Sequence, residues 1–158
     1  MSAKFLTFSV GGEEYAVDIL KVQEIIGMLP ITYVPGSHPS IEGVVNLRGR
    51  IIAVIHLAHC FGMAASPRGD ESCIVVTQTA RGEMGILVER VSDVVELAPE
   101  DVEGPRTLGL ESSSKYLLGI GKTERGICMI VDIERVVAST QALNDPPQTT
   151  PQSEEVRT

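Results

Sequence analysis

The sequence predicts an all-β protein, mainly strands with a few short helices, and three observations lead to this fold class. Apolar residues make up 43% of the chain, aromatic residues only 4%, and Trp is absent, so Val, Ile and Leu must build the core. Val and Ile favour pleated, half-buried surfaces. Turn signals recur about every 8–12 residues, as in barrels and sandwiches, and strands do not alternate with long helices.

The N-terminal segments are expected to form a hairpin followed by a short helix. Apolar and polar side chains alternate over residues 4–10 and 14–19, and Gly11-Gly12 marks the turn between them. Residues 19–26 change to a helical period. The pattern therefore predicts a short helix there, although the same letters could continue a strand.

A second hairpin is expected after a proline-containing loop. Residues 28–40 contain three prolines, so they predict a loop with at most an edge strand near residues 31–34. Residues 44–47 and 50–55 have the composition of strands, with Arg48-Gly49 at the turn. The second of these runs is apolar on both faces, which indicates a buried central strand.

The middle of the chain contains the best candidate for an internal boundary. Residues 57–61 can form one helical turn, and residues 62–71 are small, polar and contain Pro and Gly. Residues 73–79 form the next expected strand. The run 84–97 is long for one strand, so we expect a break or bulge near residues 89–91.

The C-terminal part predicts a loop, a hairpin, a helix and a tail. Residues 99–114 are expected to be a long loop, and residues 116–120 and 126–132 a hairpin. Residues 132–141 show one apolar helical face. Residues 144–158 are rich in Pro, Gln, Thr and Glu, which predicts a disordered tail.

The folded part of the chain is therefore expected to span residues 4–141. Two small barrels, divided near residues 62–71, would bury the Val- and Ile-rich strands and remove most open sheet edges. Composition and periodicity alone do not separate this arrangement from a single sandwich.

Charge and cysteine content narrow the function classes. The net charge of −8 and the lack of a Lys/Arg cluster disfavour nucleic acid and anionic membranes as partners. No apolar run approaches the roughly 20 residues of a membrane helix, and the N-terminus lacks the pattern of a secretory signal. Three widely spaced cysteines in apolar surroundings indicate free thiols in a reducing cytoplasm.

Candidate catalytic chemistry is sparse. His56, His59 and Cys60 lie close together in the sequence, but zinc sites usually draw their ligands from two spaced pairs. Cys73 and Cys128 lie in apolar runs, where a thiol is normally protonated and inert. We expect no metal, no cofactor and no catalytic residue, and a small hydrolase or metal-dependent enzyme that uses His56, His59 and Cys60 stays an alternative.

One polar motif is suited to binding. Asn46-Leu47-Arg48-Gly49 lies at the expected hairpin tip, where Gly49 permits a positive φ. The Arg48 guanidinium would then offer its donors to carboxylates or carbonyls of a partner, or to local loop carbonyls. A solvated turn arginine explains the same pattern equally well from physics alone.

Five segments, taken together and in order, resemble the CheW family of chemotaxis coupling proteins. They include K-V-Q-E-I and N-L-R-G, and they are residues 5–25, 41–55, 85–97, 116–121 and 130–137. The resemblance implies two five-stranded SH3-like β-barrel subdomains around a shared core. It also implies a non-enzymatic scaffold that bridges the cytoplasmic tip of methyl-accepting chemoreceptors and the regulatory domain of the histidine kinase CheA.

The resemblance also implies roles for seven residues. Those expected to contact the receptor are Val22, Gly43, Arg48, Gly85 and Val94. Those expected to contact the kinase are Glu24 and Ile25. The two partners are expected to dock on opposite flanks of the molecule. One departure from the family is His56, which stands where the family often has an aspartate that could cap the next helical turn.

The same resemblance allows a second pathway. A CheW-like adaptor of a non-motility system, controlling pili, biofilm or a second messenger, would share all of these motifs. Either adaptor is expected to be cytoplasmic and associated with membrane-bound receptor arrays, without inserting into the membrane itself.

Overall fold

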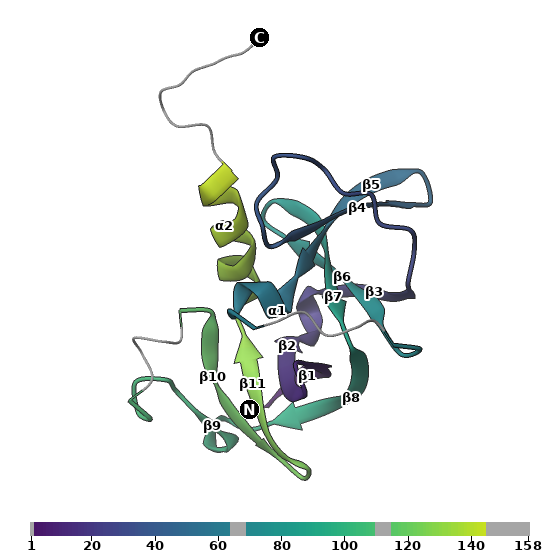
Figure 1. The fold of residues 1–158 in the computed structure, drawn as a ribbon. Coiled ribbons are helices and arrows are strands. Elements are labelled where there is room, and N and C mark those ends of the chain that lie inside the picture. Colours follow the sequence, from purple (N-terminus) through teal and green to yellow (C-terminus); the bar gives the residue numbers. More distant parts are fainter. Residues whose placement is uncertain (1, 64–68, 110–114, 145–158) are drawn as a thin grey trace.

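The computed structural model describes residues 2–63, 69–109 and 115–144, and it contains two β-sheets with short helices (Figure 1). The first sheet has six strands in the order β8-β1-β2-β11-β10-β9, and only the β2–β11 pair is parallel. Its strands are β1 (Ala3–Val10), β2 (Glu13–Asp18), β8 (Arg90–Leu97), β9 (Val102–Glu103), β10 (Leu117–Thr123) and β11 (Gly126–Val131).

The second sheet has five strands in the order β3-β6-β7-β5-β4, and only the β5–β7 pair is parallel. The edge strands β3 and β4 both come from the N-terminal half of the chain. The strands of this sheet are β3 (Val22–Gly27), β4 (Ile41–Leu47), β5 (Arg50–His56), β6 (Cys73–Thr79) and β7 (Gly82–Val88).

Helices are few among the described residues. Two single 3₁₀ turns, η1 (Ile19–Lys21) and η2 (Pro99–Asp101), precede β3 and β9. Helix α1 (Leu57–Cys60) continues from β5, and α2 (Ile133–Asn144) follows β11. In Figure 1, α2 rises from the end of β11 along the side of the five-stranded sheet.

Three apolar clusters hold the sheets together. The largest lies between the two sheets and contains side chains of both, for example Phe8 and Val17 from one and Val75 and Ile86 from the other. A second cluster belongs to the five-stranded sheet alone. A third belongs to the six-stranded sheet and is built around Leu97 and its neighbours. Each sheet therefore curls around its own small core while it shares the large one.

The predicted all-β class is confirmed, but the predicted pair of five-stranded closed barrels is wrong in detail. In the described part of the chain, one sheet has six strands, and neither sheet closes by hydrogen bonds between its first and last strands. The chain also does not change sheets near residues 62–71, because that segment lies between β5 and β6 of one sheet. The changes occur at η1 and again between Val88 and Arg90, where β7 ends and β8 begins.

The predicted helix over residues 19–26 is wrong. Only Ile19–Lys21 form a 3₁₀ turn, and Val22–Gly27 form the edge strand β3. The reason is tertiary: β3 pairs with β6 and places Ile26 against the inner cluster of the five-stranded sheet. That pairing outweighs a local pattern that was compatible with both states.

Some of the other local predictions are confirmed, and others are confirmed only in part. The break in the run 84–97 is confirmed, since β7 and β8 are separated at Glu89. The edge strand near residues 31–34 reduces to a single bridge between Thr32 and Val44. β5 is an interior strand as predicted, but Ile51 is 64% exposed, so its burial is not complete on both faces. The expected tail beyond Asn144 lies outside the described residues.

Candidate interaction site

The tip of the β4–β5 hairpin holds Arg48 in an unusual backbone conformation. Arg48 and Gly49 form a two-residue turn with φ values of 52° and 87°. Two positive φ values match the turn type that suits the twist of a hairpin, and its central positions normally take Asn, Asp or Gly. The Gly49 N–H donates to Asn46 Oδ1 at 2.8 Å and braces the turn. The backbone of Arg48 is therefore fixed in a conformation that residues with a Cβ seldom adopt.

Arg48 reaches across to the opposite edge of the sheet. Its Nη2 lies 2.5 Å from Glu24 Oε1, and Glu24 belongs to β3. β3 and β4 are the two edge strands of the five-stranded sheet. The sheet is therefore curled so strongly that an ion pair, rather than a ladder of backbone hydrogen bonds, joins its edges.

A second polar group lies at the same end of the sheet. Glu83, the second residue of β7, accepts from Arg50 Nη1 at 2.5 Å and also from the Gln23 amide. These two contacts, Gln23 first, lower the pKa of the Glu83 carboxyl. Alternation along β5 puts Arg50 on the same face as Ile52 and Val54, which are buried in the inner cluster. The charged side chains therefore cover the end of that cluster.

Apolar side chains remain exposed on the same strands. Ile25 follows Glu24 in β3 and is 45% exposed, and Ile51 follows Arg50 in β5. Leu20, in the turn before β3, is 87% exposed. Protein interfaces combine apolar area with a few charged anchors, and here strand alternation points Ile25 and Ile51 to the opposite face of the sheet from Glu24 and Arg50. We define the β3 surface as Leu20, Gln23, Glu24, Ile25, Arg48, Arg50 and Glu83.

The structure brings some of the expected site residues together. Glu24, expected to contact the kinase, and Arg48, expected to contact the receptor, form a direct ion pair. The expectation of opposite flanks is therefore wrong for these two residues. Ile25 is on the same strand as Glu24, whereas Val22 at the start of β3 is half-buried and packs against the shared core.

Two expected site residues are glycines inside packed structure. A Cβ on Gly43 would overlap the Thr32 carbonyl oxygen and lie 2.8 Å from Ile31 Cγ2. A Cβ on Gly85 would lie 2.8 Å from Ile74 Cγ2. Both positions are buried, so each glycine fits a place in the packed sheet that a side chain would overfill.

Val94 lies apart from the β3 surface, on the edge strand β8 of the six-stranded sheet. Its side chain is 49% exposed and lines a groove between β8 and the β10–β11 hairpin, together with Ile127. Arg125 crosses this groove to Asp93 at 3.9 Å. The receptor-contact set expected from the sequence therefore does not form one continuous patch.

His56 and His59 each contact a nearby polar side chain. His56 Nδ1 lies 3.5 Å from Glu42, and His59 Nδ1 lies 3.0 Å from Ser40 Oγ. Burial raises the pKa of the Cys60 thiol. No three His, Cys, Asp or Glu side chains among the described residues lie close enough to hold a metal ion. The geometry does not support the alternative of a metal-dependent enzyme.

Sequence reasoning missed Gln23, Arg50 and Glu83. Arg50 stood beside the motif that carried Arg48, so its position was a usable signal. The bulge between Val22 and Glu24 that releases Gln23 from pairing is a property of the β3–β6 ladder, and the sequence of β3 alone does not contain it.

Comparison with known proteins identifies the family. The protein-family model described as "CheW-like domain" matches residues 4–141 of the chain. The chain belongs to the CheW family. It is 34% identical over 138 residues to "Chemotaxis protein CheW" of Klebsiella aerogenes, covering 87% of this chain and 83% of that protein. It is 32% identical to "Chemotaxis protein CheW" of Thermotoga maritima, covering 84% and 85%.

A solved structure agrees with this CheW-family fold. The crystal structure of the scaffolding protein TtCheW from Thermoanaerobacter tengcongensis superposes with a TM-score of 0.77 at 30% identity. The superposition covers 85% of this chain and 91% of that one. Among the described residues of this CheW-family chain, no helix is long and apolar enough to cross a membrane.

Proposed function

We propose that this CheW-family chain is a non-enzymatic adaptor that couples the cytoplasmic tip of methyl-accepting chemoreceptors to the regulatory domain of the histidine kinase CheA. The names of its relatives, chemotaxis proteins and a scaffolding protein, support the class. The observation that carries the proposal within this chain is the Glu24–Arg48 contact, in which the exposed Arg48 side chain meets a half-buried Glu24 carboxylate on the strand that also carries the exposed Ile25.

Arg48 contributes little net stability to the fold. An exposed ion pair contributes about 0–1 kcal/mol to stability. A non-glycine residue with a positive φ costs on the order of 1 kcal/mol. The two effects nearly cancel, so stability does not account for an arginine at this position. Partner recognition by a pre-positioned guanidinium does account for it.

In this proposal the two docking surfaces adjoin where Glu24 and Arg48 touch. Arg48 contacts the receptor at the β3 surface and Val94 contacts it at a separate place on β8, while Val22, Gly43 and Gly85 support the backbone of the five-stranded sheet. Glu24 and Ile25 contact the kinase. Since Glu24 and Arg48 touch, each partner can change the ion pair that the other meets, which couples the two binding events. The protein would work in the cytoplasm, beside membrane-bound receptors.

Binding measurements test the proposal. Full-length chain carrying Arg48→Ala or Glu24→Ala is titrated with a receptor signalling fragment and with the CheA regulatory domain. We expect R48A to weaken receptor binding and E24A to weaken kinase binding, each by about tenfold or more. Arg135→Ala is the matched control, because Arg135 is similarly exposed and also pairs with one carboxylate. Unchanged affinities in both variants would overturn the proposal.

A separate comparison distinguishes the output pathway. An adaptor of a non-motility system would bind the receptor and kinase encoded with that system more tightly than those of the swimming pathway. We expect loss of the gene to abolish movement in soft agar. Normal swimming with altered pili or biofilm would assign the chain to the second pathway.

A further inference from the structure

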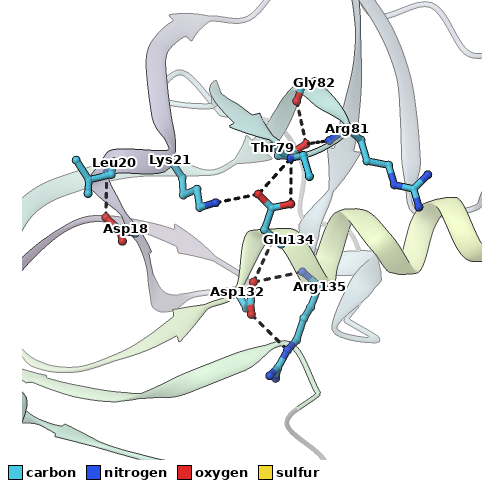
Figure 2. Close-up of polar contacts among 10 residues, drawn as sticks. Asp18, Leu20, Lys21, Thr79, Arg81, Gly82, Asp132, Glu134 and Arg135 are labelled. Atoms are coloured by element: carbon cyan, nitrogen blue, oxygen red, sulfur yellow. Dashed lines mark hydrogen bonds and ion pairs between the residues drawn. The ribbon is translucent and has the colours of Figure 1, made fainter.

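We propose that Glu134 is a positioning residue that joins the two sheets and thereby sets the orientation of the β3 surface. Its single carboxylate connects the end of β11 to the start of β3 and to the β6–β7 turn (Figure 2). The part of this inference that concerns binding rests on the proposed function. The contacts that join the two sheets belong to the fold, so they can be tested without a binding partner.

The backbone of Glu134 is fixed to the six-stranded sheet. Asp132 directly follows β11, and its N–H donates to the Tyr116 carbonyl at 2.8 Å. Asp132 Oδ1 accepts the N–H groups of Glu134 at 3.0 Å and Arg135 at 3.3 Å. This arrangement caps the N-terminus of α2. The backbone of Glu134 therefore moves with β11.

The Glu134 carboxylate contacts the segment that crosses from one sheet to the other. Lys21 is the last residue of η1, the turn that leads from β2 of one sheet to β3 of the other. Asp18 fixes this turn by accepting the Leu20 N–H at 2.9 Å. Lys21 Nζ then lies 2.9 Å from Glu134 Oε2. The contact ties the first residues of β3 to α2.

The Glu134 carboxylate also contacts the five-stranded sheet. The Ala80 N–H, in the β6–β7 turn, donates to both carboxylate oxygens of Glu134, at 3.1 and 3.3 Å. Thr79 stiffens this turn, because its hydroxyl accepts the Arg81 N–H and donates to the Gly82 carbonyl. A charged acceptor makes a backbone hydrogen bond stronger than a neutral one does.

The electrostatics agree with a formed joint. The hydrogen bond from Lys21, followed by that from Ala80, lowers the pKa of the Glu134 carboxyl. The same hydrogen bond to Glu134 raises the pKa of Lys21. Both groups are therefore charged at neutral pH, and each favours the charged form of the other.

The contacts of Glu134 add directed interactions to the apolar packing of the shared core. Apolar packing between two curled sheets is non-directional, whereas hydrogen bonds have a preferred geometry. The three hydrogen bonds to the Glu134 carboxylate therefore constrain the orientation of one sheet relative to the other. β3 begins one residue after Lys21 and carries Glu24 and Ile25, so the orientation of the β3 surface depends on Glu134, which belongs to α2.

Nuclear magnetic resonance on the full chain tests the joint. Residual dipolar couplings report the relative orientation of the two sheets, and amide exchange reports the Ala80 N–H. We expect Glu134→Ala to change the relative orientation and to speed Ala80 exchange about tenfold. Lys21→Met should keep Ala80 protected while it changes the couplings of β3. Wild-type couplings and wild-type Ala80 exchange in E134A would overturn the inference.

A matched control and a binding measurement complete the test. Arg135→Ala removes an ion pair from the same helical turn but no contact with the five-stranded sheet, so it should leave both readouts unchanged. We expect E134A to weaken binding of the CheA regulatory domain, whereas R135A does not. An altered sheet orientation with wild-type affinity would overturn the positioning role. Failure of the wild type to bind CheA would instead overturn the proposed function.

Discussion

Glu24 and Arg48 stand on opposite edges of the five-stranded sheet, yet their side chains meet at 2.5 Å. The contact shows how far the sheet has curled, because it joins the tip of the β4–β5 hairpin to β3, the strand that also carries the exposed Ile25. The exposed ion pair of Arg48 stabilises the fold slightly, and its left-handed backbone conformation destabilises the fold by a similar amount. We therefore expect stability and binding to respond differently to substitution at Arg48.

Replacing Arg48 by Asn should separate folding from binding. Asn tolerates a positive φ much better than Arg does, so we expect the melting temperature to stay within about 2–4 °C of the wild type or to rise. The same substitution should weaken receptor binding about tenfold or more, because the guanidinium is lost. Thermal unfolding and titration with a receptor fragment measure both effects.

Gly49→Ala is the control for this hairpin. It keeps the guanidinium but places a Cβ where φ is 87°, so it should lower the melting temperature. A stable G49A protein, or an R48N protein that melts well below the wild type, would contradict the assignment of strain to this turn.

The sequence predicted the strands well because their pattern is local. Alternation located most strands, and the length of the run 84–97 indicated its break at Glu89. The error over residues 19–26 arose because the same letters suit a helix or a strand, and pairing with β6 decided between them. How β1 and β2 join β8–β11 in one sheet depends on contacts between residues far apart in the chain, which periodicity does not encode.

The site was predictable only in part, for a similar reason. Arg48 was found because its hairpin signals are local and its motif is shared with a family. The contact of Arg48 with Glu24 depends on the curl of the sheet, and that of Glu83 with Gln23 depends on a bulge. Both features arise from three-dimensional packing, so the composition of the segments did not reveal them.

Gly43→Ala should destabilise the fold through a backbone clash. A Cβ would overlap the Thr32 carbonyl, whose residue forms the bridge with Val44. Overpacking of this kind costs about 1–3 kcal/mol. We expect a lower midpoint in urea unfolding. Gly27→Ala is the control, since that glycine has open space around its Cβ position and no positive φ. Equal midpoints for the two variants would contradict the prediction.

His56→Asn should strengthen the short helix α1. His56 occupies the N-cap position, but its side chain makes no capping hydrogen bond. Asn at an N-cap stabilises a helix by about 1 kcal/mol, which corresponds to a rise of roughly 2–4 °C in melting temperature. His56→Asp should gain less, because its carboxylate would face Glu42, now 3.5 Å from the imidazole. The order H56N above H56D in thermal unfolding checks the assignment.

Acid should weaken the fold through Glu134 and Glu83. Hydrogen bonds, from Lys21 to Glu134 and from Gln23 to Glu83, lower the pKa of each carboxyl below the ordinary value of 4.5. A carboxyl with a lowered folded-state pKa stabilises the protein above its unfolded-state pKa, and this stability is lost as pH falls through the folded-state value. Glu134→Gln should therefore flatten the decline of unfolding free energy below pH 4.5, measured by urea titration at successive pH values. The raised pKa of Lys21 works at the other end, since its contribution is lost only as pH rises above 10.5. An acid decline as steep in E134Q as in the wild type would show that the carboxylate is not held as the structure places it.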